Sequence, residues 1–283
     1  VKKLRTSFFI KNDEIRAVDE VSFHVNKQEV VAIVGESGCG KSVTQMSIMQ
    51  IVQSPPGKIL GGEVLLEGKD LLKLNKRSMS KVRGRQISMI FQEPMTSLNP
   101  VMKVGDQISE VIRTHTKCSK EEAWRIGIKA LEEVGIPDSA SRMNNYPFEM
   151  SGGMCQRVMI AIAVACQSKL IIADEPTTAL DVTTQAQVMD LLISLVEKKG
   201  VSLIIVTHNL GLVTRYADRI YTMYAGKIVE SGTTEVLLTN PQHPYTKGLL
   251  NSVPKLAASN YVHFFRVVSM QKLVYAINCK HPI

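Results

Sequence analysis

The sequence predicts an α/β fold in which a mainly parallel β-sheet is covered by helices. Short apolar runs of strand length occur at 30–34 (VVAIV), 170–173 (LIIA) and 201–206 (VSLIIV). Segments with helical spacing separate these runs, and the one that starts at Val182 repeats apolar residues every three or four positions as far as Val196. Strands that alternate with helices form a parallel sheet with helices on both faces.

The elements around these runs follow in order. Alternating Val21, Phe23 and Val25 predict antiparallel strands in the first thirty residues, and hence an N-terminal antiparallel β subdomain. We expect a helix over 43–53, closed by the turn SPPG at 54–57. Further strands are expected at 63–67 and 86–91.

Between 93 and 150 the pattern changes to helical spacing. Val104, Ile108 and Ile112 recur every four residues. Ser119, followed by Glu122, is a capping-box start for a helix that ends near Gly135. The sequence therefore predicts an inserted α-helical subdomain over 93–150.

The predicted strand at 30–34 runs directly into a phosphate-binding loop, GESGCGKS, of the form G-x-x-x-x-G-K-S. Glycines let successive backbone N–H groups surround phosphates, Lys41 adds a point charge and the Ser42 hydroxyl can ligate Mg²⁺. The helix that follows adds its positive dipole end. We therefore predict a P-loop NTPase core that binds nucleotide through Gly35, Glu36, Ser37, Gly38, Cys39, Gly40, Lys41, Ser42 and Val43.

Composition limits the alternatives. The 283-residue chain has ordinary hydrophobic content and no apolar run of membrane-spanning length. Its start lacks the features of a signal peptide, and its five cysteines include no C-x-x-C pair, which favours a reducing cytoplasm over disulfides or zinc. The net charge of +8 is spread along the chain, with one dense basic segment at 73–85.

Further motifs follow the loop in a fixed order. Gln92 ends the 86–91 strand, MSGGMCQR at 150–157 opens a helix, and Asp174-Glu175 ends the LIIA strand. Asp181 precedes the next helix, and His208 ends the IIVTH strand. In this order the chain resembles the nucleotide-binding subunit of an ABC transporter over about residues 1–255.

Each of these residues has a physical role. Asp174, at a strand end across from the loop, can hold Mg²⁺ with Ser42 and Gln92. Glu175 can polarise the attacking water, and Gln92 can reach both the metal and that water. Asp181 is a helix N-cap.

The resemblance implies the remaining roles. His208 would contact the γ-phosphate. The N–H groups of Ser151, Gly152 and Gly153 would meet the γ-phosphate held by a second subunit, and Asp181 would lie at that dimer interface. Phe8 and Phe9 are candidates for stacking on the base, and each is equally compatible with a place in the core.

Residues near the motifs narrow the resemblance to the oligopeptide/dipeptide (and nickel) import branch. These are SGGM, QEPMTSLNP at 92–100 and NPQHPYTKGLLNSVPKL at 240–256, within a C-terminal extension at 232–283. The branch implies a homologous or identical ATPase partner, two membrane permease subunits at the cytoplasmic face and, indirectly, an extracytoplasmic solute-binding protein. The 92–146 insert would be the coupling surface.

Two features depart from that branch. Cys155 replaces a residue that is often Arg, which would alter the partner interface. Cys279 is the only cysteine after Leu256 and cannot form a Cys₄ iron–sulfur site, so we expect no cluster from this chain alone.

Three functions remain to be compared. The first is an ATP-hydrolysing subunit of a peptide importer, with nickel or another small solute as the alternative cargo. The second is a soluble ABC ATPase that acts on nucleic acid, supported only by the basic segment at 73–85; we expect no nucleic-acid partner. The third, a metabolic P-loop kinase, explains neither SGGM nor His208.

Overall fold

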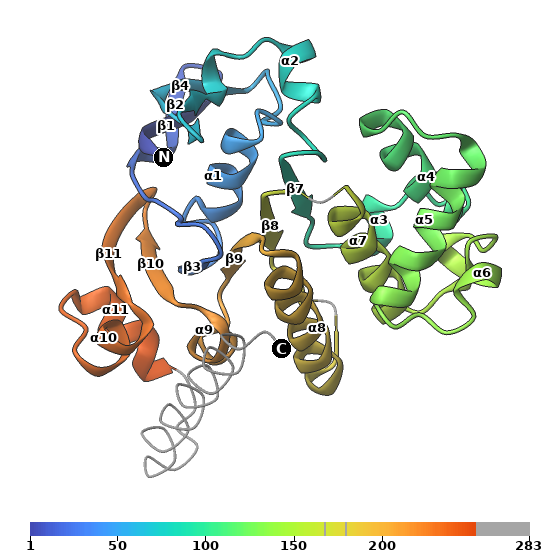
Figure 1. Ribbon diagram of the computed structural model, residues 1–283. Helices are drawn as coiled ribbons and strands as arrows, with labels where there is room; N and C mark the ends of the chain where they lie inside the picture. The colour runs from blue at the N-terminus through green and yellow to red at the C-terminus, as the bar shows by residue number, and fades with distance from the viewer. Residues whose placement is uncertain (167, 179, 253–283) are drawn as a thin grey trace, which may run out of the picture.

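The computed structural model describes residues 1–166, 168–178 and 180–252 (Figure 1). The strands are β1 (Lys2–Ile10), β2 (Asp13–Val21), β3 (Val30–Val34), β4 (Gly57–Glu63), β5 (Leu65–Leu66), β6 (Lys69–Asp70), β7 (Ile87–Ile90), β8 (Leu170–Asp174), β9 (Ser202–Thr207), β10 (Arg219–Tyr224) and β11 (Lys227–Thr233). The helices are α1 (Lys41–Ile48), α2 (Lys76–Ser80), α3 (Pro94–Ser97), α4 (Val104–His115), α5 (Lys120–Glu133), α6 (Ser139–Arg142), α7 (Gly152–Ala165), α8 (Val182–Lys199), α9 (Leu210–Tyr216), α10 (Thr234–Thr239) and α11 (Pro244–Ser252).

A six-stranded sheet forms the centre, in the order β11-β10-β3-β9-β8-β7. Neighbours from β10 to β7 pair in parallel, and only β11 pairs antiparallel, at the edge. The α/β fold with a mainly parallel sheet is thus confirmed. Because β3, β7, β8 and β9 are parallel, their carboxyl ends meet at one edge of the sheet.

The two faces of this sheet bury different sets of side chains. Ile171 and Ala173 point into a core formed with α7, α8 and the inserted helices, whereas Ile172 points into a core formed with α1 and the N-terminal strands. This alternation is the two-residue period of a strand. It explains why the predicted strands 30–34 and 170–173 are apolar at every position.

The N-terminal antiparallel sheet has the order β2-β1-β4. The prediction that Val21, Phe23 and Val25 share a strand is wrong, because β2 ends at Val21. Val21 and Phe23 are both buried, as the alternation required. However, among the described residues the backbone of Phe23 forms hydrogen bonds with Val1 alone, so no ladder continues.

Two predicted elements have different bounds. The helix expected over 43–53 is α1, which begins at Lys41 and ends at Ile48, because Gln50 adopts a left-handed φ of 50°. The Arg83 guanidinium donates hydrogen bonds to the carbonyls of Met49 and Gln50 beyond the helix end. The strand expected at 63–67 is divided between β4 and β5, since the Val64 N–H donates to the Asp70 side chain and not to a neighbouring strand.

Every regular element between 93 and 150 that the structure describes is helical. Helices α4 and α5 pack on α7 through Ile108, Ile112 and Leu131, and Figure 1 shows this group to one side of the central sheet. The Ser119 hydroxyl accepts a hydrogen bond from the Glu122 N–H and caps α5. Across the described residues, no helix combines the length and the apolar character needed to cross a membrane.

Candidate functional site

The phosphate-binding loop joins β3 to α1 at the carboxyl edge of the sheet. A Cβ added to Gly40 would lie 2.2 Å from the Ala17 carbonyl oxygen, and Gly40 has a φ of +106°, so only glycine fits here. Lys41 is 5% exposed, and its ammonium group donates hydrogen bonds to the carbonyl oxygens of Gly35 and Glu36, each at 2.8 Å. The loop thus holds a lysine charge at the start of a helix, where anions bind.

Asp174 brings a buried carboxyl group to the loop. The Ser42 hydroxyl donates to Asp174 Oδ1 at 3.1 Å, across 132 residues of chain. Burial raises the pKa of Asp174 above its ordinary value, with the Ser42 hydrogen bond opposing the shift and the charge of Glu175 adding to it. A hydroxyl and a carboxylate at this distance are the hard oxygen ligands that Mg²⁺ prefers, so the residues fit the ion that the sequence predicts.

Glu175 is the centre of a second group of contacts. His208 Nδ1 lies 3.0 Å from Glu175 Oε1, and Gln92 Nε2 donates to Oε2 at 3.0 Å. The Thr178 hydroxyl also donates to Oε2, at 2.8 Å. The structure therefore brings together the three residues that the sequence nominated for catalysis.

The backbone and the charge of Glu175 fit a functional role. Its φ of 45° is rare for a residue with a side chain, and such strain gathers at functional sites. Burial alone would raise the pKa of Glu175, but the hydrogen bonds from His208 and Thr178 hold it below its ordinary value. The lowered pKa keeps Glu175 a carboxylate at neutral pH, and its side chain is 12% exposed.

The turn Ser151–Gly153 is separate from this group. The Ser151 hydroxyl accepts from the Met154 N–H at 3.3 Å and caps α7, and Ser151 and Gly152 are exposed. Gly153 lies near Thr184 of α8, whose N–H donates to its N-cap Asp181 at 3.0 Å. Within the described part of the chain, no hydrogen bond or ion pair links this turn to the phosphate-binding loop.

The structure adds residues that sequence reasoning missed. Thr178 contacts Glu175 from three positions along the chain, a spacing that a search around the acidic pair would have found. The Gly226 N–H, in the β10–β11 turn, donates to the Cys39 carbonyl at 2.9 Å, and the Tyr245 hydroxyl accepts from the Glu36 N–H at 2.9 Å. Both contacts join segments about two hundred residues apart, so no local sequence pattern predicts them.

Three other sequence-based expectations can be placed. Cys155 is completely buried within its own chain, and its thiol donates to the Pro147 carbonyl. That its replacement of an arginine alters the partner interface stays a prediction. Phe8 lies against Gly57 of β4, and Phe9 is 45% exposed on β1. Cys279 lies outside the described residues.

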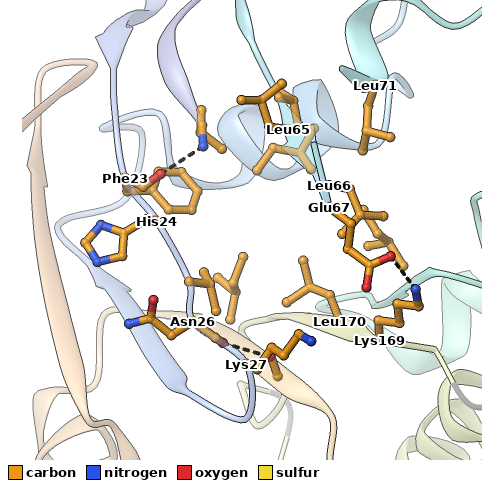
Figure 2. Close-up of a pocket in the computed structure, with 17 residues that line it drawn as sticks. Phe23, His24, Asn26, Lys27, Leu65, Leu66, Glu67, Leu71, Lys169 and Leu170 are labelled. Atoms are coloured by element: carbon orange, nitrogen blue, oxygen red, sulfur yellow. Dashed lines mark hydrogen bonds and ion pairs between the residues drawn. The ribbon is translucent and has the colours of Figure 1, made fainter. Parts of the chain in front are cut away.

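A cavity of about 190 Å³ lies at the opposite end of the strands (Figure 2). Its walls are apolar side chains such as Phe23, Leu71 and Leu170, and the ion pair of Lys169 with Glu67 lies at its rim. Leu170 and Ser202, which also line it, are the first residues of β8 and β9. Because the loop 35–42 is at the carboxyl ends, this cavity is not part of the candidate site.

Comparison with known families gives two matches. Residues 18–178 match the model described as "ABC transporter", and residues 229–266 match "Oligopeptide/dipeptide transporter, C-terminal region". The first match spans β2 to Thr178 and so contains the loop, Gln92 and the acidic pair.

Curated proteins with similar sequences include two from Bacillus subtilis (strain 168). The oligopeptide transport ATP-binding protein OppD is 54% identical over 92% of this chain and 72% of its own length. The dipeptide transport ATP-binding protein DppD is 50% identical over 90% of this chain and 76% of its own length.

Solved structures resemble this chain in fold. The ATP-binding cassette MJ0796, solved as a dimer in a post-hydrolysis state with ADP and Pi, gives a TM-score of 0.74 at 27% identity, covering 82% of this chain and 97% of that one. A cbiO1 protein from Clostridium perfringens gives a TM-score of 0.69 at 23% identity over 96% of this chain and 99% of that one.

Proposed function

This chain belongs to the ABC transporter ATP-binding family, in its oligopeptide/dipeptide branch, and from that premise we propose that it hydrolyses ATP to power the import of peptides. The observation that carries the proposal is the meeting of Lys41 and Asp174 with the Glu175 group at one edge of the sheet. The nucleotide would bind in the loop 35–43, and the proposed catalytic residues are Glu175, His208 and Gln92.

The chain's own groups divide the chemistry among them. Ser42, Asp174 and Gln92 would hold Mg²⁺, which when bound would neutralise charge on the β- and γ-phosphates. Glu175 orients a water molecule and accepts its proton as the water oxygen attacks the γ-phosphorus, and the bond to the bridging β,γ-oxygen breaks. His208, held by Glu175, offers its other ring nitrogen to the γ-phosphate.

We infer that the complete site is shared between two ATPase subunits. Ser151, Gly152 and Gly153 lie at the start of α7, with Ser151 and Gly152 exposed, and in the described part of the chain no hydrogen bond or ion pair joins them to the loop. A second copy, or a homologous partner, would receive them at its γ-phosphate, with Asp181 at the same interface. The dimeric state of MJ0796 with ADP and Pi supports this arrangement.

The inserted helices offer a surface for the membrane subunits. Met95 is 47% exposed, Val101 is 80% exposed and Phe148, just after the predicted coupling segment 92–146, is 65% exposed while stacked on Tyr146. Exposed apolar side chains of this kind mark contact sites. We propose that two permease subunits dock here at the cytoplasmic face of a membrane, and that an extracytoplasmic solute-binding protein delivers the peptide to them.

The basic segment at 73–85 does not favour a nucleic-acid partner. Arg83 uses its guanidinium on the backbone of 49–50, and Lys73 forms an ion pair with Asp70. Nickel or another small solute remains the alternative cargo within the same branch.

Two measurements test this function. ATP hydrolysis by the purified chain should rise faster than linearly with protein concentration, because each site needs a second Ser151 turn; strict proportionality down to nanomolar protein would contradict the shared site. Co-expression with a permease pair and its binding protein should give ATP-dependent peptide uptake into vesicles, lost in Lys41→Ala. Uptake of nickel chelates but not of peptides would show that the transported solute is a nickel chelate and would contradict the peptide assignment.

A further inference from the structure

Helix α11, the last helix in the described part of the chain, contacts the phosphate-binding loop. The Tyr245 hydroxyl oxygen accepts a hydrogen bond of 2.9 Å from the N–H of Glu36, 209 residues earlier in the chain. The Tyr245 ring also packs on Tyr224 at the end of β10, with 4.5 Å between ring centroids. Figure 1 shows α11 beside β10 and β11.

Other contacts fix α11 independently of the loop. The Glu230 carboxylate on β11 accepts hydrogen bonds from the N–H groups of Gln242 and His243, just before the helix begins. Leu249 and Leu250 pack on the core formed by α9 and α10. Tyr245 is therefore held by a docked element, so its hydroxyl is a stable partner for the loop.

The peptide group that Tyr245 contacts is the one that binds Lys41. The N–H of Glu36 and the carbonyl of Gly35 belong to a single planar peptide unit and point in opposite directions. Tyr245 accepts from that N–H, while the Lys41 ammonium donates to that carbonyl at 2.8 Å. The plane of the peptide is thus held from both sides.

This arrangement leaves one ammonium donor with a weak acceptor, the Cys39 thiol at 3.9 Å. An ammonium group has three N–H donors, and Lys41 uses two of them on the carbonyls of Gly35 and Glu36. The third is the donor that a phosphate oxygen would accept from. Its direction depends on the two carbonyls that position the ammonium, and one of these is the carbonyl of the peptide that Tyr245 holds.

We propose that Tyr245 is a positioning residue for the nucleotide site. Its hydroxyl fixes the Gly35–Glu36 peptide and, through it, the Lys41 ammonium that meets the β/γ-phosphates. The proposal rests on the proposed ATP-binding function and extends the site to α11. Since the contact is with the loop and not with the γ-phosphate, ATP and ADP should depend on it equally.

Tyr245→Phe tests the proposal, because it removes the hydroxyl and keeps the ring against Tyr224. Loss of one hydrogen bond that orders a binding group corresponds to a rise in Kd of about threefold to tenfold. We expect this rise for both MgATP and MgADP in titration calorimetry of the full chain. We expect kcat at saturating ATP to stay unchanged, since the Glu175 group is untouched.

Tyr224→Phe is the matched control. It removes the hydroxyl of the neighbouring tyrosine, whose ring centroid lies 4.5 Å from that of Tyr245. Among the described residues the Tyr224 hydroxyl makes no hydrogen bond. Its Kd values should equal those of the unaltered chain, and thermal melting should show that both variants fold alike. Equal Kd values for Tyr245→Phe and Tyr224→Phe would overturn the proposal, as would a fall in kcat without a change in Kd.

The result also separates this proposal from the function beneath it. If the unaltered chain binds MgATP and Lys41→Ala does not, the ATP site stands whatever Tyr245→Phe does. If the unaltered chain fails to bind MgATP, the proposed function itself fails.

Discussion

Glu175→Gln is the substitution that probes the proposed chemistry most directly, because glutamine has nearly the same shape. Both Gln92 and Thr178 donate to Glu175 Oε2. A glutamine with its carbonyl oxygen at that place keeps both hydrogen bonds. Its NH₂ group then faces His208 Nδ1, which can accept in one of the two neutral tautomers. The substitution therefore removes the base and leaves the surrounding contacts in place.

The expected loss is large for hydrolysis and small for binding. A positioned general base contributes about 10² to 10⁴ in rate, so kcat should fall by that factor, or by about 2.7 to 5.4 kcal/mol in activation free energy. MgATP should bind as before, since Lys41 and the loop are unchanged. The ATP-bound dimer should consequently accumulate.

Single-turnover hydrolysis, nucleotide titration and size-exclusion chromatography with ATP measure these three quantities. Glu197→Gln is the matched control, because Glu197 is an exposed carboxylate on α8 that no ion pair engages in the described part of the chain. It should behave as the unaltered protein does. A kcat for Glu175→Gln within about tenfold of the unaltered value would remove Glu175 from the role of base.

Three further substitutions test the loop, the metal ligands and the insert. Asp174 has a pKa raised above its ordinary value of 3.8, chiefly by burial, and such a carboxyl contributes stability that is present below the ordinary value and lost as pH rises through the folded one. In metal-free protein Asp174→Asn should therefore flatten the decline of the unfolding free energy as the pH rises above about 4, measured by urea titration at a series of pH values; an unchanged decline would refute this. Gly40→Ala forces a Cβ against the Ala17 carbonyl, so nucleotide affinity should drop at least tenfold in titration calorimetry, and normal affinity would show that the loop can shift. Ser119→Ala removes the cap of α5 and should lower the free energy of unfolding by about 1 kcal/mol without changing the Kd for ATP, and a change in that Kd would mean that the insert contributes to nucleotide binding.

Local signals were sufficient for much of the architecture. The caps at Ser119, Ser151 and Asp181 are each made by an N–H three residues later, so a short stretch of sequence contains both partners. The buried strands were evident because both of their faces are covered. Where the sequence misplaced an element, as at 43–53, the deciding group was distant: the Arg83 side chain supports the backbone where α1 stops.

Spacing along the sequence cannot show which residues of the candidate site contact one another. The sequence nominated Gln92, Glu175 and His208 as strand-end residues, but Gln92 and Glu175 are 83 positions apart. Their meeting requires β7, β8 and β9 to be neighbours in parallel, which is a property of the sheet order. The strand ends follow from composition, and their adjacency follows from pairing.

Short stretches of sequence are enough to place a phosphate-binding loop between a buried strand and a helix, and to name the side chains at the strand ends. The contact of Thr178 with Glu175 and that of Tyr245 with the loop form because the folded sheet and helices bring these residues together. The difference is the sequence separation between the two contacting residues. A motif and a cap are specified by residues a few positions apart, whereas a hydrogen bond across 209 residues exists only once the sheet has formed and α11 has docked beside it.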